Sequence, residues 1–290
     1  MSKKTKLEHS LRQVLKIVQK DSYATRYDRK RLLLNFTNDL YKLGYKLTNI
    51  YGLKTKHIEA AVKYWQEKNL SNGSIKNRMA AIRKLSRLLH KIKLVPTNKE
   101  LNIGKRTYFS GINRALYAPD FSGISNPYIK GSLELQRVFG LRREESLKIK
   151  PYLADKGDKI ELLSSWCKGG RSRVIPILRE EQRMALEAAK KLVKGFGNSL
   201  IPEGKSYISQ RAVYDKQVWR SGLRHLHGLR HAYAQKRYKE LTGWEAPLNG
   251  GPTSKMLSTD ERKRDYAARI ILTEELGHSR EQITVSYLGR

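Results

Sequence analysis

The C-terminal half of the chain contains an ordered set of basic and phenolic residues whose types suit phosphoryl transfer. The set consists of Arg142 in GLRREE, Lys168 in CKGGRSRVIP, His227 and Arg230 in HGLRHAYA, His278 in ELGHS, and Tyr287 in VSYLGR. Each residue alone is commonplace, since a lone Arg or Lys is ordinarily solvated and a lone Tyr ordinarily packs. Together they supply the groups that cleave a phosphodiester without a metal ion.

Arg142 and Arg230 supply permanent positive charge in this scheme. The transition state of phosphoryl transfer gathers charge on its non-bridging oxygens, and a guanidinium offers fork-shaped donors that match them. His227 and Arg230 are three residues apart at a predicted helix start, so their side chains share one helix face. We therefore expect these two residues to converge on one phosphate.

Tyr287 is the predicted nucleophile. A phenol can form a covalent phosphate ester when a nearby group accepts its proton, and His278 lies nine residues upstream, far enough for a turn to bring the imidazole back. Lys168 lies in a turn-rich segment and can protonate the leaving 5′-oxygen as a general acid. We expect Glu145 and His231 to support the arginines and the phosphate rather than to carry protons.

These motifs resemble those of the tyrosine recombinases, also called phage integrases. The order Arg, Lys, His-x-x-Arg, His, Tyr is reproduced, and GLR followed by Glu145 looks like the first arginine box of that family. HGLRH is similar to the second box, and LGHSREQITVSYLGR to the final segment with its nine-residue step from histidine to tyrosine. The resemblance is specific in the catalytic half and looser in the helical N-terminal half.

The resemblance implies a mechanism and an assembly. Tyr287 would attack a phosphate activated by the other five residues, leaving a 3′-phosphotyrosyl link and a free 5′-hydroxyl, with no cofactor and no metal. It implies a homotetramer on two DNA duplexes that acts through a Holliday junction, helped by an accessory DNA-bending or directionality factor. Integration or excision of a mobile genetic element is the favoured task. The alternatives are a topoisomerase-like enzyme and a non-catalytic DNA-binding protein on the same fold, whereas a metal-dependent nuclease would need clustered carboxylates.

The composition indicates a polyanionic partner. The 290 residues include 59 Lys and Arg against 27 Asp and Glu, giving a formal net charge of +32 that is spread along the chain. Such a charge favours DNA or RNA as the partner through counterion release, although a ribosomal or nucleoid-packing protein would share it, and the resemblance narrows this partner to double-stranded DNA. The sequence has no membrane-spanning stretch, no secretory signal and a single cysteine, Cys167. We therefore expect a cytoplasmic protein without a membrane partner, associated with the nucleoid when it is bound to DNA.

The predicted fold is mainly α with a small β-sheet (α+β). Helical periodicity dominates up to Pro96, β-like runs at 159–163 and 173–177 flank a turn, and helices are expected over 179–193 and 227–241. With the resemblance, this predicts a helical core-binding (SAM-like) DNA-binding domain over 1–104, a linker over 105–127 and a catalytic domain over 128–290.

One N-terminal helix is a candidate DNA-binding element. Its apolar stripe consists of Ile75, Met79, Ile82, Leu85, Leu89 and Ile92, and the opposite face carries Lys76, Arg83, Lys84 and Arg87. A charged outer face is often only solvated, but the scarcity of acidic residues among these basic ones favours a surface that faces phosphates. The NRMAAIR stretch at 77–83 also looks similar to core-binding helices of the family.

Two features depart from the family pattern. About 47 residues separate His231 from His278, and they include GWEAPLNGGPTSKML and STDERKRDYAAR. We expect a solvated excursion here, with a contact to a partner subunit or to DNA as the alternative. The chain also ends three residues after Tyr287. We therefore expect either that subunit assembly uses surfaces other than a long C-terminal tail or that the chain has been shortened.

Overall fold

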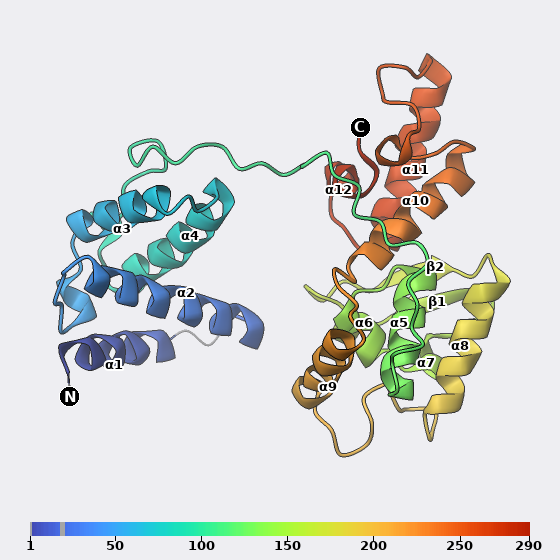
Figure 1. Ribbon diagram of the computed structural model, residues 1–290, viewed down its shortest axis with the longest axis horizontal. Helices are drawn as coiled ribbons and strands as arrows, with labels where there is room; N and C mark the ends of the chain where they lie inside the picture. The colour runs from blue at the N-terminus through green and yellow to red at the C-terminus, as the bar shows by residue number, and fades with distance from the viewer. Residues whose placement is uncertain (1, 18–20) are drawn as a thin grey trace. The chain divides into compact units, whose positions relative to one another are not determined.

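The computed structural model describes residues 2–17 and 21–290. Contacts divide the chain into two compact units, residues 1–108 (unit 1) and residues 109–290 (unit 2) (Figure 1). The described part of the chain contains no helix that is long and apolar enough to cross a bilayer. The mainly helical class with one small sheet is the class that the sequence predicts.

In its described residues, unit 1 is a bundle of four helices with two short 3-10 turns. Its elements are α1 (Lys3–Lys16), α2 (Tyr23–Lys42), η1 (Ile50–Gly52), α3 (Thr55–Glu67), α4 (Asn72–Leu88) and η2 (Ile92–Leu94). Serine side chains cap three of these helices by accepting a backbone N–H three residues further on, at Ser2, Ser22 and Ser71. The helices enclose an apolar core that includes Leu7, Leu11, Phe36, Ile58, Trp65 and Met79.

The helix that carries the predicted basic face is shorter than its apolar stripe suggests. α4 ends at Leu88, and His90 follows with a left-handed φ of 56°. The stripe is buried from Ile75 to Leu89, but Ile92 is 81% exposed. The predicted place of Ile92 on this stripe is therefore wrong, because the chain leaves the helix before it.

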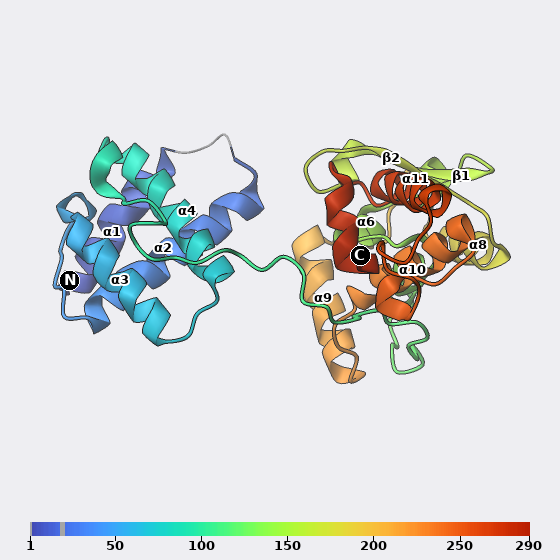
Figure 2. The same ribbon diagram turned by 90° about the horizontal axis from the view of Figure 1, so that it is seen from above.

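Unit 2 packs helices around a single two-stranded antiparallel sheet. Its elements are α5 (Pro127–Phe139), α6 (Arg143–Lys148), α7 (Pro151–Ala154), β1 (Lys159–Leu162), η3 (Ser164–Trp166), β2 (Arg173–Pro176), α8 (Glu180–Leu192), α9 (Tyr207–Arg220), α10 (Gly228–Thr242), η4 (Pro247–Asn249), α11 (Thr259–Glu275), η5 (Glu281–Thr284) and α12 (Val285–Leu288). The strands pair with Ile160 opposite Ile175, and both side chains are buried. Helix α5 packs against α8 and α10, and α10 packs against α11 and α12 (Figures 1 and 2).

Part of the segment expected to be a linker belongs to the body of unit 2. Phe121 and Ile124 are buried in a cluster with residues of α5 and α10. The amide of Leu116 donates a hydrogen bond to the carbonyl of Gly228 at 2.9 Å. The second half of the 105–127 segment is therefore held against the start of α10, because its few apolar side chains pack there.

The long segment between His231 and His278 is not a solvated excursion along its whole length. It contains α11, whose Ala268 and Leu272 are buried in the core of unit 2 together with Leu276 just beyond the helix. The charged stretch STDERKRDYAAR forms the capped, exposed start of this helix. The segment therefore builds the part of the core from which His278 emerges.

Candidate active site

Four segments of unit 2 supply five of the six side chains of the predicted site. Arg142 directly precedes α6, Arg230 lies in the first turn of α10, and His278 follows the end of α11. His227 is the residue before α10, and Tyr287 lies on α12. The helical register of α10 and its packing against both α11 and α12 bring the C-terminal groups to the start of α10.

Arg230, His278 and Tyr287 form a hydrogen-bonded cluster. The Tyr287 hydroxyl lies 3.2 Å from Nε2 of His278 and 3.4 Å from Nε of Arg230. Nη2 of Arg230 also lies 3.3 Å from the same His278 nitrogen. Tyr287 is buried, with an exposed fraction of 5%, and Arg230 is buried at 1%. A phenol, an imidazole and a guanidinium therefore share one protected site.

Arg230 is held by two backbone carbonyls besides the phenol. Nη1 donates to the carbonyl of Gly140 at 2.6 Å, and Nη2 donates to the carbonyl of Leu276. Gly140 has a left-handed φ of 61°, and a Cβ at this position would lie 2.5 Å from the Tyr233 ring. Only a glycine fits here, so the end of α5 can approach α10 closely enough to accept this hydrogen bond. Burial lowers the pKa of Arg230 to about 10, which keeps the group charged at neutral pH.

Two more histidines lie beside the phenol. The His231 ring centroid is 4.6 Å from that of Tyr287, and the ring of the exposed His227 is 6.2 Å away. Burial, and then the charges of Arg230 and Arg142, lower the pKa of His278 to about 3. Burial and then His227 lower the pKa of His231 to about 4. Both imidazoles are therefore neutral at pH 7, and they are weak bases until an anion such as a phosphate offsets the nearby guanidinium charges.

Glu145 joins Arg142 to a further arginine that the sequence reasoning did not single out. Its carboxylate accepts from Nη1 of Arg142 at 2.7 Å and from the Arg142 amide at 2.7 Å. The same carboxylate accepts two hydrogen bonds from Arg173, at 3.0 and 2.6 Å. Burial raises the pKa of Glu145, but Arg173, Arg142 and Arg230 outweigh it and hold the pKa at about 2.

The alternation of side chains along the predicted strand could have identified Arg173 as a buried residue. Alternate residues of a strand point to the same side of the sheet, and Arg173 is two residues before the buried Ile175. An arginine at an inward strand position predicts a buried charge with a fixed partner. Gln235 was also missed; it donates to the carbonyl of Tyr287 at 2.8 Å and so fixes the backbone of α12.

Lys168 lies apart from this cluster. It is exposed in the turn between β1 and β2, directly before Gly169 and Gly170, whose φ values are 78° and 69°. Among the contacts of the described residues, no hydrogen bond or ion pair joins its side chain to Arg230, His278 or Tyr287. Among these contacts, the structure therefore does not bring Lys168 together with the other predicted site residues.

An open cavity borders the cluster on the side of His227. It has a volume of about 340 Å³ and lies between α5, α9 and the start of α10. Gln136, Tyr214 and Leu226 form its walls, and Arg143 and His227 lie among its lining residues. The described residues contain no group of three or more His, Cys, Asp or Glu side chains that could hold a metal ion.

Family models match both units. The model described as "Phage integrase, N-terminal" matches residues 4–95, and the model described as "Integrase" matches residues 123–236. The chain belongs to the phage integrase family. The two matches together cover most of the chain and confirm the predicted family.

Solved structures share the fold of this family member. The Tn1549 transposon integrase, solved in complex with a circular intermediate DNA, is 14% identical, with a TM-score of 0.54 over 100% of this chain and 96% of that one. The XerH site-specific recombinase bound to palindromic difH substrate is 16% identical, with a TM-score of 0.57 over 97% of this chain and 80% of that one. No curated protein matches the chain in sequence.

The predicted DNA-binding side chains of α4 differ in their solvent exposure and in whether they are hydrogen-bonded within the protein. Arg87 is exposed, and Lys76 and Lys84 are partly exposed. Arg83, in contrast, donates to the carbonyl of Pro96 at 3.1 Å and to Oδ1 of Asn98 at 2.8 Å. This arginine fixes the turn that follows η2, so less of its charge is available to a ligand than the pattern on α4 suggests.

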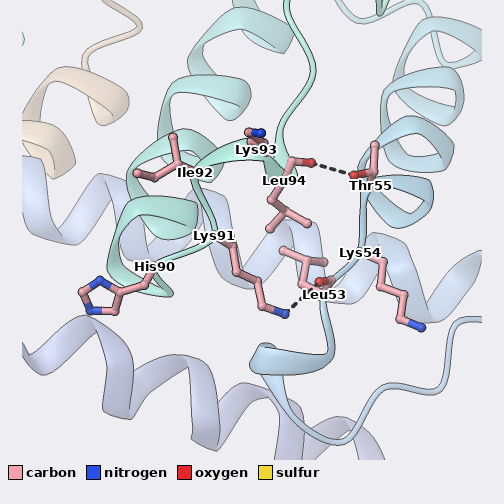
Figure 3. Close-up of a pocket in the computed structure, with 8 residues that line it drawn as sticks. All are labelled: Leu53, Lys54, Thr55, His90, Lys91, Ile92, Lys93 and Leu94. Carbon is pink, nitrogen blue, oxygen red and sulfur yellow. Dashed lines mark hydrogen bonds between the residues drawn. The ribbon is translucent and has the colours of Figure 1, made fainter.

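Unit 1 also has a basic groove that the sequence did not indicate. This cavity has a volume of about 520 Å³ and lies between the start of α3 and η2. Figure 3 shows the residues that line it. Its lining includes Lys54, Lys91, Lys93 and His90 and no acidic residue. Lys91 is held at one edge, where Nζ donates to the carbonyl of Leu53 at 3.4 Å (Figure 3).

Proposed function

We propose that the protein is a site-specific DNA recombinase that cleaves and rejoins strands through a covalent 3′-phosphotyrosyl intermediate at Tyr287. One observation carries the proposal. The Tyr287 hydroxyl lies within hydrogen-bonding distance of both a neutral imidazole and a buried guanidinium, at 3.2 and 3.4 Å. These are the two groups that a phenol needs in order to lose its proton and attack a phosphate.

The chemistry starts with His278. Its Nε2 accepts the phenolic proton as the Tyr287 oxygen forms a bond to phosphorus, and the bond from phosphorus to the 5′-oxygen breaks. Arg230 and Arg142 stabilise the charge that develops on the non-bridging oxygens, with His227 at the rim of the site as a further donor. Lys168 supplies a proton to the 5′-oxygen, which requires bound DNA to draw the hairpin toward the site. The phosphotyrosyl ester stores the bond energy for rejoining, so no cofactor is consumed.

Double-stranded DNA is the proposed partner. The net charge of +32 supports this choice, and so do the DNA complexes of the Tn1549 integrase and XerH. We also propose a homotetramer on two duplexes, a cytoplasmic location with association to the nucleoid, and an accessory DNA-bending or directionality factor. Integration or excision of a mobile element is the proposed task, and the likeness to a transposon integrase supports it.

A trapping experiment tests the proposal. The protein is incubated with nicked DNA carrying the flanking sequences of its own gene, denatured, and examined for a protein–DNA adduct that is mapped by mass spectrometry. We expect an adduct on Tyr287 that the Tyr287→Phe variant lacks, with DNA affinity changed by no more than about twofold, since one hydroxyl among many phosphate contacts is lost. Tyr266→Phe is the matched control, because this tyrosine is exposed on α11 and should leave the adduct intact.

Two outcomes would point to the alternatives. Tight DNA binding without any adduct would indicate a non-catalytic DNA-binding protein. An adduct on Tyr287 that leads only to relaxation of supercoiled plasmid, with no recombinant product from paired sites, would indicate a topoisomerase-like enzyme. An adduct on another residue would reject Tyr287 as the nucleophile.

A further inference from the structure

Arg173 is buried at the point where the hairpin joins the rest of unit 2, and the proposed chemistry gives it no role. It begins β2, pairs with Leu162 in the sheet register and has an exposed fraction of 8%. Four residues separate it from Lys168 across the turn. A buried arginine costs desolvation energy unless every donor finds a partner, so its contacts indicate what it holds in place.

The donors of Arg173 reach three different segments. Nη1 and Nη2 donate to the two carboxylate oxygens of Glu145, which lies in α6, at 3.0 and 2.6 Å. Nε donates to the carbonyl of Glu275 at the end of α11, at 2.8 Å. Nη1 also lies 3.3 Å from Sγ of Cys167, the residue directly before Lys168. One guanidinium therefore joins the hairpin to the segments that carry Arg142 and His278.

The turn before His278 is shaped around this side chain. Gly277 has a left-handed φ of 63°, and a Cβ there would lie 3.0 Å from Cδ of Arg173 and 3.2 Å from its Nη1. On the other side, Glu145 holds Arg142 with the same carboxylate that binds Arg173. Arg142, Glu145 and Arg173 thus form a continuous chain from one edge of the site to the base of the hairpin.

We propose that Arg173 is a positioning residue that fixes the base of the 167–173 turn, and through it aims Lys168 at the 5′-oxygen of the scissile phosphate. This inference rests on the proposed function. The planar fork of an arginine can serve two carboxylate oxygens, a carbonyl and a sulfur at once, and the single ammonium of a lysine cannot. Arg173 acts through Lys168 and does not touch the DNA.

A change of leaving group distinguishes a role of Arg173 in positioning the general acid Lys168 from a purely structural role. In DNA whose scissile 5′-oxygen is replaced by sulfur, the leaving group is a thiolate, which departs without a proton because a thiol has a pKa of about 8.5. A variant that has lost only general-acid help should therefore cleave this DNA nearly as well as the unchanged protein does. A variant with a damaged phosphate clamp or nucleophile should stay slow on both substrates.

The experiment compares Arg173→Lys and Arg173→Gln with Lys168→Ala on both DNAs, following the rate of adduct formation at saturating DNA. On ordinary DNA we expect Arg173→Lys to be about 100-fold slower, in the range of general-acid catalysis. On the sulfur-containing DNA we expect it to recover to within about threefold, as Lys168→Ala does. Arg183→Met is the control, because Arg183 also pairs with a carboxylate in unit 2, that of Asp155, but lies away from the hairpin turn.

Three results would overturn the inference. The first is an unchanged rate for both Arg173 variants on ordinary DNA. The second is a slow rate on both DNAs for variants that are folded by circular dichroism, while Lys168→Ala recovers. The third is loss of folding in Arg173→Lys and Arg173→Gln alike, which would make Arg173 a residue of the core. If the unchanged protein forms no adduct on Tyr287, the proposed function itself fails, and that result is visible before any variant is compared.

Discussion

Basic residues are used in two different ways in the two units. On α4, Lys76, Lys84 and Arg87 lie along one helix at spacings set by its turn, at least partly exposed to solvent. In unit 2, Arg230 and Arg173 are buried, and each is held by acceptors from several segments. The first arrangement adds to a long-range field, and the second fixes atoms in place.

The difference determines what each group can contribute. Each exposed cation that contacts a DNA phosphate raises the DNA affinity by a roughly similar increment. The size of that increment depends on the salt concentration. Buried cations barely change affinity, but the loss of one leaves carbonyls or a carboxylate without a partner and removes charge from the reacting centre. Variants in unit 2 should therefore change rate and stability, and variants on α4 should change binding.

Arg230→Lys should give the largest effect. A lysine keeps the charge but cannot reach the carbonyls of Gly140 and Leu276 and the Tyr287 hydroxyl together. We expect adduct formation at saturating DNA to fall by about 100- to 1,000-fold, the usual cost of losing a charge-stabilising donor. The free energy of unfolding should fall by about 1–3 kcal/mol because a buried acceptor loses its partner, which urea titration measures.

Arg211→Lys is the control for that variant, since Arg211 is exposed on α9. It should leave both rate and stability unchanged. A normal rate for Arg230→Lys would show that the charge alone suffices and that the fork geometry described here does not matter.

Replacing Lys84 and Arg87 together with alanine should weaken DNA binding by about tenfold at moderate salt. Each lost phosphate contact lowers the slope of log K against log salt by about 0.9, so two lower it by about 1.8. Adduct formation at saturating DNA should be unchanged. Binding titrations at several salt concentrations measure both quantities.

Arg83→Ala separates the two uses of charge within α4 itself. Because Arg83 is bound to Pro96 and Asn98, its loss should alter the salt slope less than the loss of Lys84 or Arg87 does. A slope change as large as that of either neighbour would mean that bound DNA releases Arg83 from its turn.

The buried histidines of unit 2 should make stability depend on pH. The pKa values of His278 and His231 are about 3 and about 4 in the fold, against a usual value of 6.5. Between pH 6.5 and pH 4 the unfolded chain therefore binds more protons, so the fold loses stability as the pH falls. We expect the urea midpoint to drop over this interval, and to drop less in the His231→Gln, His278→Gln double variant. An equal drop in both proteins would assign the effect to other groups.

The sequence predicted some parts of the molecule better than others for physical reasons. The hairpin was expected over 159–163 and 173–177 and lies at Lys159–Leu162 and Arg173–Pro176, because β-branched and apolar runs around glycines leave few other choices. Helix α11 was missed because its inner face contains Arg269, Thr273 and Glu275 beside leucines. Polar residues at buried positions interrupt the apolar stripe along the helix. Helix prediction depends on that stripe.

The site shows the same limit. The order of the motifs suggested that Arg230, His278 and Tyr287 converge, and they lie within hydrogen-bonding distance of one another. The order could not show that Glu145 would bind two arginines, because Arg173 lies on a strand 28 residues away. Nor could it place Lys168, which is exposed in the turn directly before Gly169 and Gly170.

The burial of Arg230 has a consequence for the protein when no DNA is bound. Its guanidinium contacts the carbonyls of Gly140 and Leu276, the Tyr287 hydroxyl and Nε2 of His278. An anion that binds this guanidinium must therefore displace one of these contacts. The carbonyls belong to the packed ends of α5 and α11, whereas the phenol stands on the four-residue helix α12. Of these partners, the phenol of Tyr287 should need the least free energy to move away from the guanidinium of Arg230. We expect the phenol of Tyr287 to shield this anion site, so that free phosphate or chloride does not occupy it before DNA does.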